Sequence, residues 1–320
     1  MLRWIKYMLW LGVGLWLMWF VFNRLPLADL LVKLKEARYG LIVPVFGVTL
    51  FGYYARVRRW QLLLQHVNHP ISFTSGWMSL SAGYLVSLAI PRGGEISRCL
   101  IVKDKHQVPF HHALASIIVE RAADTFCLML LITTIVVLNI QNMSQFFWLQ
   151  VIHPVQGKFT QYWSYLLPGV LLVIIIGIWF WKKKQHTHAG IVGQFLQALR
   201  NFLAIEQKGL FLFYTLIIWS CYFLMTYIWV FAFDESMGLN IAQVFVIMVV
   251  GTVGKSVPIQ GGGMGAYHFL VAKAFGVFAV SFLTANALAV IIHGAQTLYT
   301  ILTGSIAYVW LLFHQKNRHL

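Results

Sequence analysis

The chain has 320 residues, of which 59% are hydrophobic and only 10% are charged. A water-soluble domain of this length needs far more charge to cover its surface, so the composition excludes one and indicates a membrane-embedded protein. The formal net charge of +15 is interpreted as basic loops beside anionic lipid headgroups. No nucleic-acid partner is expected, because no water-soluble scaffold with a basic groove is available.

Apolar runs recur along the whole chain. A run that crosses lipid must be helical, because lipid offers the backbone no hydrogen-bond partners, and it needs about 20 residues to cross the hydrocarbon core. Full spans are therefore predicted at 4–22, 39–57, 113–138, 162–181, 209–233 and 281–312. The first begins beside Arg3 and Lys6 and precedes no small-residue cleavage site, so we expect an uncleaved span.

Two further apolar segments are broken in mid-course by proline and glycine. The first, 71–101, breaks at 91–94, and the second, 241–278, breaks at 258–263. Non-helical backbone at membrane depth is tolerated only against protein or a water-filled cavity. The alternative is that these residues merely kink two ordinary spans.

We expect the broken segments to form two re-entrant hairpins, over 71–112 and 241–279, that enter the membrane from opposite sides. Broken helices in matching positions of two halves, about 1–140 and about 160–320, are typical of transporters built as inverted repeats. The predicted fold class is an all-α integral membrane protein. It has about six full transmembrane helices plus the two hairpins, nominally eight membrane segments, in a single polytopic domain over 1–320.

Basic loops set the expected orientation, because Lys and Arg accumulate on the cytoplasmic side. Both chain termini and three basic groups are placed in the cytoplasm: Lys182 to Lys184, Lys316 with Arg318, and Arg56, Arg58 and Arg59. The loops at 139–161 and 234–235 are placed outside. Arg24, Lys33, Lys35 and Arg38 do not fit this scheme, and 24–35 is interpreted as an amphipathic helix on an inner- or plasma-membrane surface.

Acidic residues are scarce, and three of the nine lie close together in the first half. Arg92, Glu95 and Arg98 are three apart and would share a helix face, while Glu120 and Asp124 are four apart. Charges inside an apolar run are costly and usually face a partner or a wet cavity. These residues predict a polar pocket in which arginines bind a phosphate. The alternative is a set of ion pairs that only locks helices together. The candidate residues in this half are Arg92, Gly93, Gly94, Glu95, Arg98, Glu120, Arg121 and Asp124.

The glycines at the first break, Gly93 and Gly94, are expected to let the backbone approach a headgroup. In the second half, Lys255 precedes the break and could neutralise a phosphate or extend to the membrane interface. The candidate residues there are Lys255, Pro258, Gly261, Gly262, Gly263, Gly265 and His268.

No catalytic residue, metal or cofactor is predicted. The histidines lack the spacing of a zinc site, and mid-span His293 is expected to bond a neighbouring helix. Cys99, Cys127 and Cys221 are widely separated and are interpreted as small buried apolar residues.

Three stretches of sequence resemble motifs of one family. Residues 89–98, Ala-Ile-Pro-Arg-Gly-Gly-Glu-Ile-Ser-Arg, resemble a P-x-x-x-G-E-x-x-R motif; 119–124, Val-Glu-Arg-Ala-Ala-Asp, resemble V-x-E-R-x-x-D; and 257–265 resemble P-G-G-x-G. All three belong to the flippase-like transmembrane domain of lysylphosphatidylglycerol synthases, and together they extend over nearly the whole chain. The resemblance implies a membrane protein that handles lipid-linked molecules. It points to Arg92, Gly94, Glu95, Arg98, Glu120, Arg121, Asp124, Pro258 and 261–265.

The sequence departs from that family in two respects. No soluble aminoacyltransferase domain follows Leu320, so we expect a chain that does not itself make lysylphosphatidylglycerol. His268 lies where the family often has an acidic residue, which leaves the substrate open.

The leading functional hypothesis is a flippase-like transporter for a lipid or lipid-linked headgroup, anionic or zwitterionic, with membrane lipids as partners. A homo-oligomer, or association with a lipid-modifying synthase, is also compatible with the sequence. The alternative function is a membrane enzyme, or enzyme subunit, that acts on lipid-linked sugars or phosphates with Glu95 or Asp124 as acid or base. A third reading is a non-catalytic scaffold for such a synthase.

Overall fold

The computed structural model describes residues 27–138, 205–257 and 260–316, and these residues form helices joined by turns, with no strand among them. The predicted spans 4–22 and 162–181, the lysine run at 182–184 and Pro258 lie outside the described residues. The prediction of an all-helical chain is confirmed for the part described.

The chain divides into two compact units. Residues 1–128 and 198–320 form the first unit, and residues 129–197 form the second. In the second unit only 129–138, the end of one long helix, is described. The architecture below is that of the first unit.

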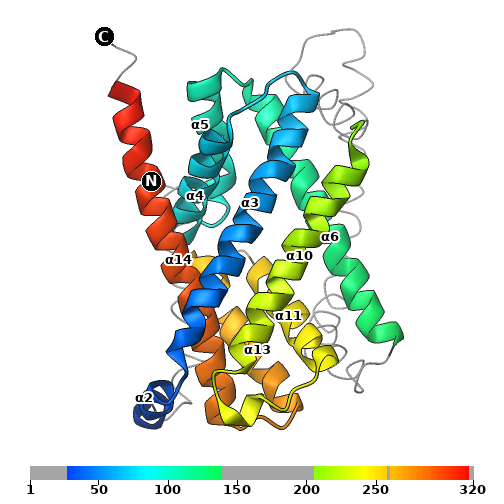
Figure 1. Ribbon diagram of the computed structural model, residues 1–320, viewed down its shortest axis with the longest axis vertical. Coiled ribbons are helices and arrows are strands. Elements are labelled where there is room, and N and C mark those ends of the chain that lie inside the picture. The colour runs from blue at the N-terminus through cyan, green and yellow to red at the C-terminus, as the bar shows by residue number, and fades with distance from the viewer. Residues whose placement is uncertain (1–26, 139–204, 258–259, 317–320) are drawn as a thin grey trace, which may run out of the picture. The chain divides into compact units, whose positions relative to one another are not determined.

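The first half of this unit is a long helix, a helical hairpin and a second long helix. A short surface helix, α2 (Leu27–Lys35), precedes α3 (Ile42–His66). The hairpin consists of α4 (Phe73–Ala89) and α5 (Gly93–His106), which pack against each other, and α6 (Phe110–Val137) follows. Both ends of the hairpin lie where α3 ends and α6 begins (Figure 1).

The second half repeats this order from the opposite end of the unit. It runs from α10 (Lys208–Val230) through α11 (Ile241–Ser256), the short α12 (Gln260–Gly263) and α13 (Ala266–Val277) to α14 (Phe282–Lys316). Helices α11 and α13 pack together, and both of their outer ends lie at the end of the unit where α2 lies (Figure 1). Helix α12, at the tip of this second hairpin, contacts α4 of the first hairpin.

Helix lengths agree with most of the predicted spans. Among the described residues, Tyr39–His66, Lys208–Val230 and Phe282–Phe313 are long and apolar enough to cross a membrane. Helix α6 is equally long but carries Glu120, Arg121 and Asp124 within it. The largest difference is at α3, which ends at His66, nine residues beyond the predicted end at 57. The sequence has no proline or glycine between position 57 and Pro70 that would end the helix earlier.

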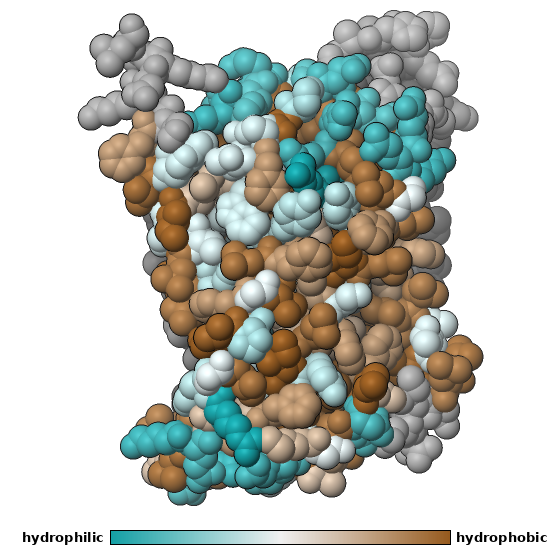
Figure 2. Space-filling view, viewed as in Figure 1, coloured by the Kyte–Doolittle hydropathy of each residue, from teal (hydrophilic) through white to brown (hydrophobic). Residues whose placement is uncertain are grey.

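Apolar side chains gather across the middle of the face shown in Figure 2, and hydrophilic side chains gather toward its two ends. Many of the exposed apolar residues lie on the long helices, among them Phe51, Leu212, Leu216 and Ile306. Large exposed apolar surfaces are rare on soluble monomers. Together with the helix lengths, this surface identifies a membrane-embedded protein. The buried thiols of Cys99 and Cys221 are free, as is Cys127, as expected.

Ion pairs join α2 to the turn between α10 and α11. Lys33 Nζ lies 3.2 Å from Glu235 Oε1, and Arg38 Nη2 lies 2.6 Å from Asp234 Oδ1. The Ser281 hydroxyl donates to Glu235 Oε2 at 2.5 Å. Two of the basic residues that did not fit the orientation scheme, Lys33 and Arg38, are therefore paired with the acidic turn.

These contacts make the free energy of unfolding depend on pH in the acidic range. The Ser281 hydrogen bond, assisted by Thr284 and Lys33, lowers the pKa of Glu235 from 4.5 to about 2. A carboxyl with a depressed pKa contributes stability that is complete above its ordinary pKa and is lost as the pH falls toward the folded-state value. Between about pH 4.5 and about pH 2, we expect Glu235→Gln and Ser281→Ala to lose less of their unfolding midpoint in detergent than the wild type. Equal pH slopes in all three proteins would contradict this.

The first hairpin depends on glycine at the contact between its helices. A Cβ on Gly94 would overlap Gly83 O and Ser87 Oγ, and one on Gly83 would lie 2.7 Å from Arg98 Cγ. The Gly94 amide donates to Ser87 Oγ at 3.2 Å. Helix α4 therefore occupies the space on the face of Gly94 that carries these contacts.

We expect Gly94→Ala to destabilise the protein by about 1–3 kcal/mol, the usual cost of overpacking. Gly47 on α3 is the matched control, because a Cβ there meets nothing within 4 Å. Gly47→Ala should be neutral or stabilising by up to about 1 kcal/mol, since alanine favours helix. Thermal unfolding in detergent measures both, and equal midpoints for the two variants would contradict the packing argument.

Candidate functional site

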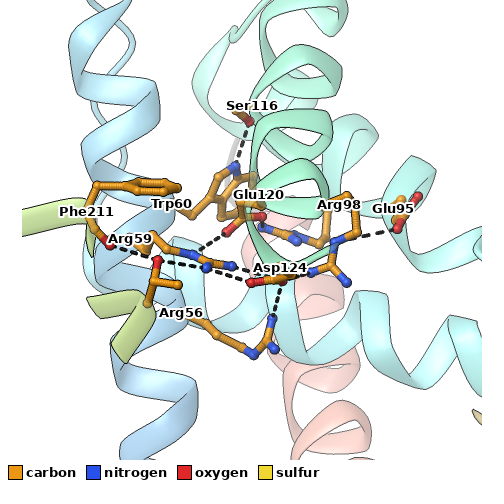
Figure 3. A network of polar contacts seen from close by, with 11 residues as sticks. Arg56, Arg59, Trp60, Glu95, Arg98, Ser116, Glu120, Asp124 and Phe211 are labelled. Atoms are coloured by element: carbon orange, nitrogen blue, oxygen red, sulfur yellow. Dashed lines mark hydrogen bonds and ion pairs between the residues drawn. The ribbon is translucent and has the colours of Figure 1, made fainter. Parts of the chain in front are cut away.

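Arg59 on α3 is the centre of a network of charged side chains inside the helix bundle (Figure 3). Its side chain is 0% exposed. Nη1 donates to Asp124 Oδ1 at 2.8 Å and Nη2 donates to Asp124 Oδ2 at 3.1 Å, which is the two-bond geometry that guanidinium and carboxylate favour. Nη1 also donates to Thr215 Oγ1 on α10 at 3.1 Å. One side chain therefore ties α3 to both α6 and α10.

A second buried pair joins α5 to α6. Arg98 Nη2 donates to Glu120 Oε2 at 3.0 Å, and these residues are 3% and 1% exposed. The Arg98 guanidinium lies 4.1 Å from the centre of the Trp60 ring, whose Nε1 donates to Ser116 Oγ at 2.9 Å. Since Arg59 Nε is 3.9 Å from Glu120 Oε1, the two pairs form one network.

Three further side chains belong to the network, and two of them, Arg121 and Glu95, extend it toward the surface. Arg121 lies 3.2 Å from Asp124 Oδ2 and 3.9 Å from Glu95 Oε1, and both Arg121 and Glu95 are partly exposed. Arg56, buried one helical turn before Arg59, lies 3.8 Å from Asp124 Oδ2 and 5.4 Å from the Tyr222 ring. Its guanidinium points toward Asp124 in Figure 3.

The network holds more positive than negative charge. Its members are the guanidinium groups of Arg56, Arg59, Arg98 and Arg121 and the carboxylates of Glu95, Glu120 and Asp124. Arg56 is the most weakly matched, because its only ion pair in the described part of the chain is with a carboxylate that Arg59 already binds twice. Nε of Arg59 and Nε of Arg98 are also buried without a hydrogen bond among the described residues. Such an arrangement suits an anion with several acceptor oxygens.

The structure brings together most of the site residues predicted for the first half. Glu95, Arg98, Glu120, Arg121 and Asp124 all belong to the network. Arg92 does not, because it is exposed and precedes α5 in a left-handed conformation with φ 60°. The predicted helix face shared by Arg92, Glu95 and Arg98 is therefore wrong for Arg92.

Arg56 and Arg59 were missed, because both were placed on the cytoplasmic side, at the end of the predicted span 39–57. Their three-residue spacing on an uninterrupted helical run was the available signal, since it places both on one face of α3. That face is buried, and the two side chains meet the carboxylates of α6.

The second half holds a separate polar cluster at its break. Gly261, Gly262, Gly263 and Gly265 have φ between 67° and 86°, a region that glycine adopts readily and other residues rarely adopt. Lys255 donates to Gln296 Oε1 and lies 5.1 Å from the Tyr267 ring. The His268 ring lies 4.8 Å from the His293 ring, so the structure adds Gln296 and His293 to the predicted residues. In the described ranges no group of three His, Cys, Asp or Glu side chains could hold a metal ion.

Charge counting predicts opposite effects for two substitutions in the network. Glu120→Gln removes a carboxylate and leaves Arg98 buried without its counter-charge, which should cost about 3–5 kcal/mol. Arg56→Gln removes the weakly matched cation, so stability should change by less than about 1 kcal/mol or rise. Unfolding midpoints in detergent compare them, with Arg58→Gln as the control on the same helix. A larger loss for Arg56→Gln than for Glu120→Gln would contradict the assignment of the excess charge.

Comparison with known proteins gives one match. No curated protein and no solved structure matches this chain. A protein family described as the lysylphosphatidylglycerol synthase TM region matches residues 7–304. That range includes α3, the two hairpins, the buried network and most of α14. The chain belongs to the lysylphosphatidylglycerol synthase TM region family.

Proposed function

We propose that the chain is a flippase-like transporter that moves lipids with a phosphate-bearing headgroup between the two leaflets of the membrane. The observation that supports this most is the buried network, in which four arginines face three carboxylates. Leaving a buried cation without full compensation costs several kcal/mol, and charged groups inside membrane segments usually mark a substrate pathway. A phosphodiester carries one negative charge, which would bring the network to neutrality.

The network lies well inside its helices. Arg59 is seven residues before the end of α3 at His66, which corresponds to ~10 Å along the axis. Glu120 is ten residues after the start of α6 at Phe110, or ~15 Å. Half of a typical hydrocarbon core is also ~15 Å. A headgroup bound by Arg56, Arg59 and Arg98 would therefore lie near mid-membrane, with its acyl chains left in the bilayer.

The hairpin helices are too short to cross the membrane. Helices α4 and α5 have 17 and 14 residues, or ~25 and ~21 Å, against a hydrocarbon core of ~30 Å. Helices α11 and α13 have 16 and 12 residues, or ~24 and ~18 Å. These lengths support two re-entrant hairpins, which enter from opposite sides because their outer ends lie at opposite ends of the unit (Figure 1).

Transport would follow from the inverted order of the two halves. In such repeats one half rocks against the other around a central site, so that access alternates between the two sides. The contact between α12 and α4 lies where the hairpins meet and would change in that motion. Arg98 and Arg59 would exchange Glu120 and Asp124 for phosphate oxygens and return to them after release. Lys255 and His268 would receive the headgroup in the second half.

The enzyme alternative fits the network less well. Of the two residues that this alternative names, Asp124 accepts a hydrogen bond from buried Arg59 at 2.8 Å, and Glu95 lies 3.9 Å from Arg121 Nε. Carboxylates held in this way serve as counter-charges, whereas acid–base catalysis needs a group within reach of the substrate proton. We place the protein in the inner or plasma membrane with cytoplasmic termini, following the basic residues at 182–184 and 316–318. Membrane lipids are taken as its partners.

The test is leaflet transfer by the purified protein in liposomes that contain fluorescent phosphatidylglycerol. Arg56→Gln should lower the rate at least about tenfold, which corresponds to the loss of one charge-assisted hydrogen bond. Arg58→Gln is the matched control. The Arg58→Gln substitution removes the same charge two residues away. The Arg58 side chain lies over the rings of Tyr54 and Phe73, outside the network.

Equal rates for wild type and Arg56→Gln would exclude the proposed site. Absence of transfer by the wild type would exclude the function. Chromatography of the same lipids distinguishes the enzyme, because chemical conversion without a change of leaflet would favour it.

A further inference from the structure

The polar cluster of the second half, which consists of Lys255, Tyr267, His268, His293 and Gln296, contains no acidic residue. The whole stretch 236–320, which includes α11 to α14, has neither Asp nor Glu. This is the opposite of the arginine network, where carboxylates hold each cation. Any positive charge formed in this cluster therefore lacks a counter-charge from the stretch 236–320.

Two imidazole rings lie at the centre of the cluster. His268 on α13 and His293 on α14 are each 6% exposed, and their rings meet edge to face with centroids 4.8 Å apart. The Gly265 amide donates to His268 Nδ1 at 3.4 Å, so Nε2 carries the proton of the neutral ring. His293 Nε2 lies 3.4 Å from Gly262 O and donates to it, which leaves Nδ1 as the acceptor nitrogen of that ring.

The surroundings of His293 disfavour a second positive charge until an anion arrives. The titratable groups that face it are Lys255 from α11, and Tyr267 and His268 from α13. Gln296 on α14 is uncharged, and α12 contributes glycine backbone to the surroundings of His293. Helix α4 contacts α12, and the only titratable residue of α4 is Tyr84. An imidazolium beside an ammonium is unfavourable. A phosphate between them removes that cost, so anion binding and proton binding assist each other.

We propose that His293 is the proton-binding site of the transporter, and that it takes up one proton when a phosphate-bearing headgroup enters the second half. This inference rests on the proposed function and adds that lipid transport is coupled to the binding of a proton. The proton comes from water on the side of the membrane to which the site is open, and it binds Nδ1. Nε2 keeps its hydrogen bond to Gly262 O, and the positive charge of the ring strengthens this bond to the glycine break. His268 positions the ring and keeps its own proton. The carboxylates of the first half are engaged by arginines and take no part.

The first experiment measures proton uptake. Short-chain phosphatidylglycerol is titrated into the full-length protein in detergent, in buffers of different ionisation enthalpy, at about pH 7.5. The wild type should take up about one proton for each lipid bound, and His293→Gln, which keeps an uncharged donor toward Gly262 O, should take up almost none. His69→Gln, the control in the loop before α4, should retain the uptake.

The second experiment measures leaflet transfer between about pH 8 and about pH 5.5. The wild-type rate should rise as the pH falls, by up to about tenfold per unit, as for a single titrating group. Over the same pH range, the rate of His293→Gln should stay constant, at the value that the wild type has at about pH 8.

Lipid binding by the wild type without proton uptake would overturn this inference and leave the proposed function standing, and this outcome needs no variant to fold. Undiminished uptake in His293→Gln would overturn it as well. Absence of both binding and transfer in the wild type would overturn the proposed function itself.

Discussion

The two-bond contact between Arg59 and Asp124 is the interaction on which the rest of the arrangement depends. Arg59 is fully buried, and a guanidinium can be held inside a helix bundle only if carboxylates and hydroxyls replace the water it has lost. Asp124, Glu120 and Thr215 provide that replacement from two other helices. The requirement fixes the rotation of α3 and α6 about their axes, and this rotation brings Glu120 to the position where Arg98 of the first hairpin can reach it.

The same contact leaves Arg56 with a share of a carboxylate that is already occupied. A network built only for stability would discard that cation, since removing it brings the charges to balance. An anion-binding site of the kind proposed would need such a cation, because its empty state is held together and yet is less than fully satisfied. Removing Arg56 would then preserve or raise stability but impair the proposed function, whereas removing the carboxylate of Glu120 would impair both.

Sequence reasoning found the parts of this site that stand out against an apolar background. Glu120 and Asp124 interrupt a long apolar run, and the glycine breaks interrupt two others; the structure brings the two carboxylates into one network. Arg56 and Arg59 were missed because they lie near the end of an apolar run, where basic residues usually mark the edge of the membrane. Arg92 was misjudged because the chain turns into a left-handed conformation just before α5. His293 meets His268 and Gly262, which precede it by 25 and 31 residues, and no local pattern predicts this contact.

The central claim is that the buried arginines bind a lipid phosphate, and the distance from the phosphorus atom to their nitrogen atoms tests it most directly. Solid-state NMR can measure it by recoupling ³¹P of bound phosphatidylglycerol with ¹⁵N of the arginine side chains in the reconstituted protein. The account predicts phosphorus at hydrogen-bonding range from Arg56 and Arg98, with the signal lost in Arg56→Gln and kept in Arg58→Gln. Phosphorus that is close only to surface residues such as Arg92 or Arg58 would contradict it.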